Sequence, residues 1–384
     1  PVALSVAEAA LPLTAAAALA AGDARAADDA RAAAQPTAEG LVALNAPNAS
    51  PASSHTPDAD GWVTCGTLRV KGGTYGKDFV YYPSVFQYPK EDGTVVKYGY
   101  GQDGHNADIL FVLSGKRLSL KNAAGANTET PAAADAARTG IWIAPGNHAD
   151  ITLAGVNIAA RPHGGIPVNV MTNIASTDTN SWALKGSQVR NRTSLHVTLA
   201  DGTKNYLFAN AANMPGIRCG EGSDLTIDDA ERNADAAGNE VVPIGGAINA
   251  ATTLASGKTL QPGDPHTALD SANPGTLEVW GGCLASGVGG ACEETGGTMT
   301  FNGGVITVHA DTANSVDYQT GAGIGGGTWG GGTDGVITFN SGIYDAIGNF
   351  HSSGVGSGCG AKSIHTYDYA IPPRPHSLRG SPEW

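Results

Sequence analysis

The side chains best suited to chemistry form an acidic group near the middle of the chain. They are Glu221, Asp224, Asp228, Asp229 and Glu231. Asp224 and Asp228 fall on an alternating, strand-like run, and Asp229 opens the loop after it. Calcium prefers carboxylate and carbonyl oxygens, so a calcium site is predicted from Glu221, Asp224, Asp228 and Asp229. Because Arg218 precedes this group, a remnant lyase site is a second interpretation, and a solvated acidic turn is a third.

Tryptophan residues are the candidates for contact with a sugar. A planar ring packs against the apolar face of a pyranose, and nearby carboxylates or amides accept hydrogen bonds from its hydroxyl groups. The predicted carbohydrate-binding residues are Trp280, Trp329 and Trp182. In similar segments Asn302 and Asn340 stand where Trp280 stands, which predicts an outward side chain for Trp280. Trp142 lies in an apolar run and is expected to pack inside.

The charge balance of the chain argues against nucleic acid as a partner. There are 22 Lys and Arg residues against 35 Asp and Glu residues, which gives a net charge of -13. Binding of nucleic acid or anionic membrane through a basic surface needs clustered Lys and Arg, and the sequence has no such run. No stretch of eighteen apolar residues follows residue 60, so we expect no membrane insertion.

Cysteine and histidine residues show no spacing typical of catalysis or zinc binding. The five cysteines include no CxxC pair, and the ten histidines are scattered without a Ser-His-Asp or Cys-His order. Cys283 and Cys292 are near enough in sequence to close a small disulfide loop, and buried free thiols are the alternative.

Short strand-like runs broken by turn residues must position these side chains. The chain holds 54 Gly residues and only 6% aromatic residues, a composition that favours many tight turns over a thick aromatic core. The segments that start at Gly275, Gly297 and Gly335 align without gaps, with apolar residues at alternate positions and a small-residue bend after them. Such a repeat predicts the coils of a parallel β-helix.

A second, glycine-rich repeat lies between these segments. It comprises residues 287–290, 323–326 and 354–357, with weaker forms at 244–246 and 216–217. Each copy offers one inward aliphatic residue flanked by glycine, which suits a tight corner. The GxGxxG match at 321–326 belongs to this repeat and is not followed by a helix pattern, so we do not interpret it as a nucleotide loop.

The chain divides into four parts by composition. Residues 1–34 are Ala-rich with small-residue patterns typical of signal peptidase sites, which predicts a partial signal peptide and therefore a secreted or cell-surface protein. Residues 35–60 are expected to be a disordered linker and 61–370 the β-helix domain. The Pro-rich residues 371–384 are expected to form an irregular tail.

The order of motifs in the body resembles one family. Residues 150–158 read DITLAGVNI, 197–205 read VTLADGTKN, and 216–228 lead from GIR to LTID. With the later GAGIGGG-type coils, this order resembles the carbohydrate-binding β-helix domains of bacterial secreted and surface proteins, over about residues 109–358. The resemblance implies an all-β, right-handed single-stranded parallel β-helix of the pectate-lyase type. It also implies binding of acidic or cellulosic polysaccharide, and calcium as a cofactor.

Three functions remain open on the sequence alone. The first is non-catalytic binding of a polysaccharide or host glycan by an exported surface protein. The second is a polysaccharide lyase or glycoside hydrolase of the same fold, and the third is a structural or protein-binding adhesin stalk. A shared fold does not choose among them.

Overall fold

The architecture is all-β. The computed structural model describes residues 49–83, 86–89, 95–98, 108–130, 136–144, 146–160, 166–171, 192–209, 213–229, 251–253, 259–261, 274–310, 320–330, 336–340, 342–349, 351–360 and 377–379. Within these ranges no α-helix occurs, and the one helical turn is the 3-10 helix η1 (Ala52–Ser54). The expected leader, Trp182, and most of the expected linker and tail lie outside the described residues.

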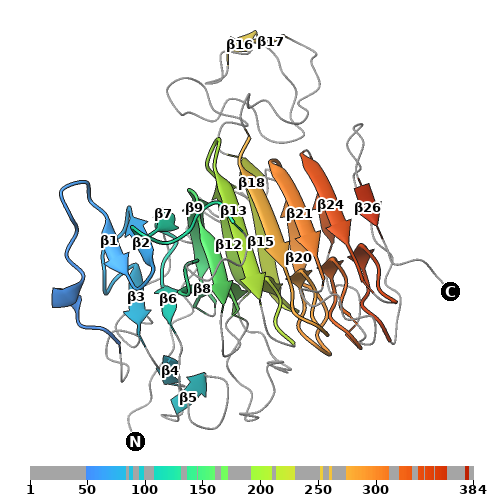
Figure 1. The fold of residues 1–384 in the computed structure, drawn as a ribbon, viewed down its shortest axis with the longest axis horizontal. Coiled ribbons are helices and arrows are strands. Elements are labelled where there is room, and N and C mark those ends of the chain that lie inside the picture. The colour runs from blue at the N-terminus through green and yellow to red at the C-terminus, as the bar shows by residue number, and fades with distance from the viewer. Residues whose placement is uncertain are drawn as a thin grey trace, which may run out of the picture.

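Three long sheets run side by side along the molecule (Figure 1). Sheet 1 has the order β1 (Val63–Cys65), β2 (Leu68–Lys71), β7 (Leu118–Asn122), β9 (His148–Leu153), β12 (Thr193–Leu199), β15 (Ser223–Asp229), β20 (Thr298–Phe301), β23 (Ile337–Phe339). Sheet 2 has the order β10 (Asn157–Ala160), β13 (Lys204–Ala209), β18 (Thr276–Trp280), β21 (Val305–His309), β24 (Ile343–Ile347), β26 (Ser377–Arg379). Sheet 3 has the order β25 (Val355–Gly356), β22 (Ile324–Gly325), β19 (Val288–Gly289), β14 (Ile217–Cys219), β11 (Val168–Val170), β8 (Gly140–Ile143), β6 (Ile109–Val112), β3 (Phe79–Tyr82). Two small hairpins complete the set, β4 (Phe86–Pro89) with β5 (Val95–Tyr98) and β16 (Thr252–Thr253) with β17 (Thr259–Leu260).

From β9 to β25 the chain visits sheets 1, 2 and 3 in strict rotation, apart from the β16–β17 hairpin between β15 and β18. Each strand pairs in parallel with the strand of the preceding and following turn, as in β9–β12–β15 and β13–β18–β21. This arrangement is compatible with the parallel β-helix that the repeats predicted.

The N-terminal strands depart from the predicted parallel pattern. β1, β2 and β7 pair antiparallel, and so do β3 and β6. The chain folds back between β1 and β2 at Gly66, whose φ of +56° suits the first position of a tight hairpin turn. The run 151–158 likewise splits into β9 and β10 at Gly155, where φ is +81°.

The main copies of the glycine-rich repeat are confirmed, and the other repeat is corrected. The weaker copy at 244–246 lies outside the described residues. Residues 288, 324 and 355 pair in register in sheet 3. Met299 and Ile337 also pair, but Leu277 pairs with Ile306 in sheet 2. The segment at Gly275 therefore forms a different side of the coil, because similar apolar alternation serves every sheet.

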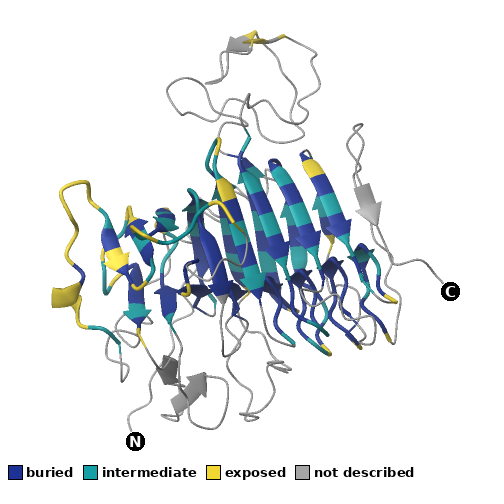
Figure 2. Ribbon diagram, in the orientation of Figure 1, coloured by how far each residue is buried: buried dark blue, intermediate teal, exposed yellow. Residues whose placement is uncertain are grey.

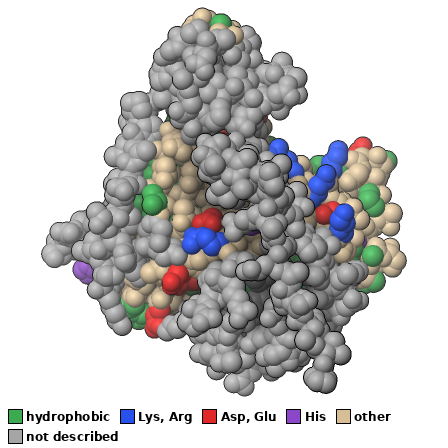
Figure 3. Space-filling view, turned by 180° about the vertical axis from the view of Figure 1, so that it is seen from behind, with side chains coloured by type: hydrophobic (Ala, Val, Ile, Leu, Met, Phe, Trp, Pro, Cys, Tyr) green, Lys and Arg blue, Asp and Glu red, His purple; other side chains and the backbone are tan. Residues whose placement is uncertain are grey.

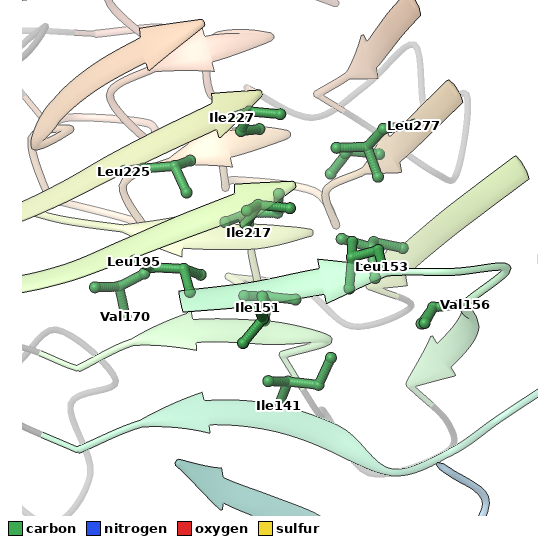
Figure 4. Close-up of a cluster of buried hydrophobic side chains, with 14 of the residues drawn as sticks. Ile141, Ile151, Leu153, Val156, Val170, Leu195, Ile217, Leu225, Ile227 and Leu277 are labelled. Carbon is green, nitrogen blue, oxygen red and sulfur yellow. The ribbon is translucent and has the colours of Figure 1, made fainter. Parts of the chain in front are cut away.

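Apolar residues at alternate positions fill the space between the sheets. Buried and half-buried residues alternate along the strands of sheets 1 and 2 (Figure 2), as the pattern of β12 shows over its seven residues. Ile151, Leu195 and Leu225 come from neighbouring strands of sheet 1 and share this core with Ile141, Ile217 and Leu277 from the other two sheets (Figure 4).

Both ends of the body extend further than expected. His55, in the expected linker, is buried and stacks on Tyr75 with ring centroids 4.2 Å apart. Its Nδ1 lies 2.8 Å from the Thr64 carbonyl oxygen. In the expected irregular tail, β26 pairs in parallel with β24. Pro375 and Pro382 flank this strand without interrupting it, so its N–H groups are available to the neighbouring strand.

Candidate functional site

An aromatic row crosses the outer face of sheet 2. Phe208, Trp280 and His309 are in register on β13, β18 and β21. Their positions alternate with inward Leu207, Val279 and Val308, which places the three rings outside. We name these three residues the aromatic row.

The rings of the aromatic row pack closely against one another. The centroids of Trp280 and His309 are 3.6 Å apart with 12° between the ring planes, and Phe208 lies 6.0 Å from Trp280. The neighbours thus cover much of the ring faces of Trp280, and a ligand on this surface meets the outward edges of a stack.

A polar row runs beside the aromatic row, two residues earlier on each strand. Tyr206, Glu278, Thr307 and Asp345 are in register there. Glu278 accepts a hydrogen bond of 2.7 Å from Trp280 Nε1, and Asp345 Oδ1 is buried with no hydrogen-bond partner. Burial lowers the pKa of His309, against the opposing charges of Glu278 and Asp345. The surface therefore combines a neutral aromatic stack with carboxylates that can accept hydrogen bonds.

The other predicted tryptophans lie elsewhere. Trp329 follows β22 of sheet 3, is 44% exposed and has a φ of +58°. Trp142 is buried, but in a second cluster on the face of β8 opposite the central core, which Ile141 and Ile143 join. Its Nε1 donates a hydrogen bond to the Ile166 carbonyl oxygen. The reasoning that aligned Trp280 with Asn302 was wrong, because Trp280 is in register with His309. Asn302 instead accepts a 2.8 Å hydrogen bond from the side chain of Asn340 on the next turn.

The predicted calcium ligands do not converge. Asp224 and Asp228 both face outward on β15, but four residues of strand separate them by roughly 13 Å. Glu221 is exposed in the preceding turn, whereas Asp229 is buried and accepts a hydrogen bond from the Gly275 N–H. Among the described residues, no group of three His, Cys, Asp or Glu side chains is placed to hold a metal ion.

Arg218 does not belong to this acidic group. It lies on β14 of sheet 3, is 2% exposed, and forms a two-pronged ion pair with buried Glu294 at 2.6 Å and 3.0 Å. Its Nη1 also donates to Asn169 on β11. This geometry stabilises the packing of sheet 3 and leaves the lyase-remnant interpretation without its base.

A charged group that the sequence analysis missed lies on the outer face of sheet 1. His196 on β12 has its Nδ1 3.4 Å from Asp150 Oδ1 on β9 and its Nε2 3.8 Å from Asp228 Oδ2 on β15. Arg117 also binds Asp150, at 2.8 Å. Alternation along each strand predicts that these side chains face outward, but only the register shows that His196 lies between the two carboxylates.

The electrostatics of this group predict a pH-dependent contribution to stability. Burial lowers the pKa of His196, but the adjacent carboxylates of Asp150 and Asp228 outweigh it and raise the pKa to about 9. The same contacts lower the pKa of Asp150, although burial of Asp150 acts in the opposite direction.

We expect His196→Gln to lower the free energy of unfolding by about 2 kcal/mol near pH 6. A raised folded-state pKa stabilises the fold fully below the unfolded value of 6.5, and this stabilisation is lost as pH rises through about 9. Urea unfolding of both proteins across this range measures the difference. A difference that stays constant with pH would show that folding does not raise the pKa of His196.

Charged side chains of both signs adjoin one another on the face seen in Figure 3.

No disulfide joins any of the five cysteines, all of which are described, so the predicted alternative of a Cys283–Cys292 loop is not formed. In the described part of the chain, no helix has the length and apolar character needed to cross a membrane. No family model, curated protein or solved structure matches this chain.

Proposed function

We propose that this chain is a right-handed parallel β-helix that binds polysaccharide without cleaving it, as part of an exported surface protein. The rotation of the chain through three parallel sheets supports the solenoid, and the flat outer faces of a solenoid suit an extended ligand. Export follows from the small-residue pattern of residues 1–34. A contribution of calcium remains a prediction.

The aromatic row, with its neighbouring carboxylates, is the observation that carries this proposal. Sugar sites combine aromatic surface with a few fixed polar groups that accept hydroxyl hydrogen bonds. The aromatic surface is formed by Phe208, Trp280 and His309. The polar groups are the carboxylates of Glu278 and Asp345. Because the row crosses successive strands, a polysaccharide chain would lie across the strands of sheet 2.

We expect Trp280→Ala to weaken binding to insoluble polysaccharide roughly tenfold or more, because it removes the centre of the stack. Depletion of protein from solution by cellulose, a neutral polymer, measures this loss. Trp329→Ala deletes the same side chain from the loop after β22 and serves as the matched variant, with a smaller expected loss. Unchanged binding by folded Trp280→Ala protein would exclude the aromatic row as the site.

A glycoside hydrolase is the second candidate, because the Asp150–His196–Asp228 group brings two carboxyl groups to one imidazole. Hydrolysis of a glycosidic bond needs two carboxyl groups, one to donate a proton and one to act as base or nucleophile. Here, both carboxylates approach the same imidazole, and Arg117 engages Asp150, so neither is free for the reaction. Release of reducing sugar that Asp228→Asn abolishes would favour this candidate over binding.

A further inference from the structure

A cluster of positive charge surrounds Trp62 at the N-terminal end of sheet 1. Lys121 Nζ lies 4.1 Å from the centroid of the Trp62 ring, Arg69 Cζ lies 5.6 Å away, and Lys71 Nζ lies 5.8 Å away. We name these four residues the Trp62 cluster.

The antiparallel pairing of the first strands assembles this cluster. Arg69 on β2 is directly opposite Lys121 on β7, and the β1–β2 hairpin carries Trp62 to the side of Lys71. The sequence shows no basic run, because the three cations come from two strands, β2 and β7, that lie about 50 residues apart. Each of the three cations alternates with a buried inward residue, so all lie on the outer face of sheet 1.

The charge of the cluster is only partly balanced. Asp58 forms an ion pair with Arg69, and it also accepts a 2.9 Å hydrogen bond from the backbone N–H of Trp62. No ion pair joins Lys71 or Lys121 to a carboxylate of the described residues. Among the described residues, the ammonium groups of Lys71 and Lys121 therefore remain without an ion-pair partner, in a chain whose net charge is -13.

Packing alone does not account for this arrangement. One cation over the ring is sufficient for a stabilising cation–π contact, and Lys121 provides it. Arg69 is paired with Asp58, but Lys71 and Lys121 are diagonal neighbours on β2 and β7, where their like charges repel. A bound anion removes this repulsion, and the exposed Lys71 can reach it from solvent.

We propose that the Trp62 cluster binds the carboxylates of an acidic polysaccharide, that is, a polymer of uronate units. Lys71 and Lys121 bind the carboxylate groups, and the edge of Trp62 contacts the sugar ring. Asp58 holds Arg69 and the Trp62 backbone in place for this contact. The cluster shares no residue with the aromatic row, so its function is independent of the binding proposed for sheet 2.

Binding of the full chain to soluble polygalacturonate tests the proposal, with carboxyl-reduced polygalacturonate as the neutral control polymer. We expect the wild type to prefer the charged polymer, and Lys71→Gln with Lys121→Gln to weaken that binding roughly tenfold and reduce its salt dependence. The matched control replaces Lys77 and Lys204, two exposed lysines outside the cluster, by Gln. Lys71→Gln alone keeps the contact between Lys121 and Trp62, so it separates ligand binding from folding.

Three results would overturn the proposal. They are equal binding of the charged and the neutral polymer, an equal loss in the control variant, and tighter binding of dextran sulfate or single-stranded DNA than of polygalacturonate. Trp280→Ala must leave binding to polygalacturonate at the cluster intact. If Trp280→Ala loses only the binding of neutral glycan, the result concerns the aromatic row and not the Trp62 cluster. The same holds if the wild type binds no neutral glycan at all.

Discussion

Replacing Glu294 by Gln should lower the free energy of unfolding by about 3–5 kcal/mol. The substitution removes the carboxylate that both prongs of the Arg218 guanidinium contact, and Arg218 is only 2% exposed. A buried charge that loses its partner keeps its full desolvation cost. Urea unfolding followed by circular dichroism measures the change.

The double variant Arg218→Met with Glu294→Leu tests the origin of this effect. Because it removes both charges, it should recover much of the loss seen in Glu294→Gln. Arg192→Gln is the matched surface control, since Arg192 and Asp224 form a 2.7 Å ion pair with side chains 44% and 36% exposed. We expect Arg192→Gln to lower the free energy of unfolding by less than about 1 kcal/mol. Equal effects at the two ion pairs would contradict the burial argument.

Replacing Gly325 by Ala should destabilise the fold by about 3 kcal/mol. Gly289, Gly325 and Gly356 have φ values of +131°, +136° and +129° at matching positions of sheet 3. A Cβ on Gly325 would lie closer to the Gly356 carbonyl oxygen than van der Waals contact permits. The glycines thus let successive turns approach through the backbone alone.

Gly155→Ala separates backbone conformation from this close approach. Gly155 has a φ of +81°, but a Cβ there would meet nothing within 4 Å. We expect a loss of about 1 kcal/mol, from the left-handed conformation alone. Thermal unfolding of the two variants provides the comparison, and a loss at Gly155 as large as that at Gly325 would argue against contact between turns.

The positions of many strands and their inward faces were predictable from the sequence, whereas the pairing between strands was predictable only in part. Alternation in segments such as 193–199 and 276–280 predicts both the strand and its inward face. The same alternation serves all three sheets, so it did not reveal that Leu277 belongs beside Ile306. Nor did it predict the antiparallel start, which depends on the turn at Gly66.

The candidate sites depend on register, and this limited their prediction. The outward position of Trp280 follows from alternation, but its stacking on His309 joins residues 29 positions apart through the pairing of β18 and β21. His196 was set aside among scattered histidines, although its neighbours Asp150 and Asp228 lie 46 and 32 residues away along the chain. Proximity in sequence instead drew attention to Asp224, Asp228 and Asp229, which alternation places on opposite faces of β15.

The most direct test of non-catalytic binding combines depletion and product release in one assay. The full chain is mixed with insoluble cellulose and with calcium-gelled pectin, with and without chelator, and the supernatant is assayed for remaining protein and reducing sugar. We predict that a polysaccharide retains the protein and that no sugar is released. Release of sugar, or no retention on either polymer, would contradict the account.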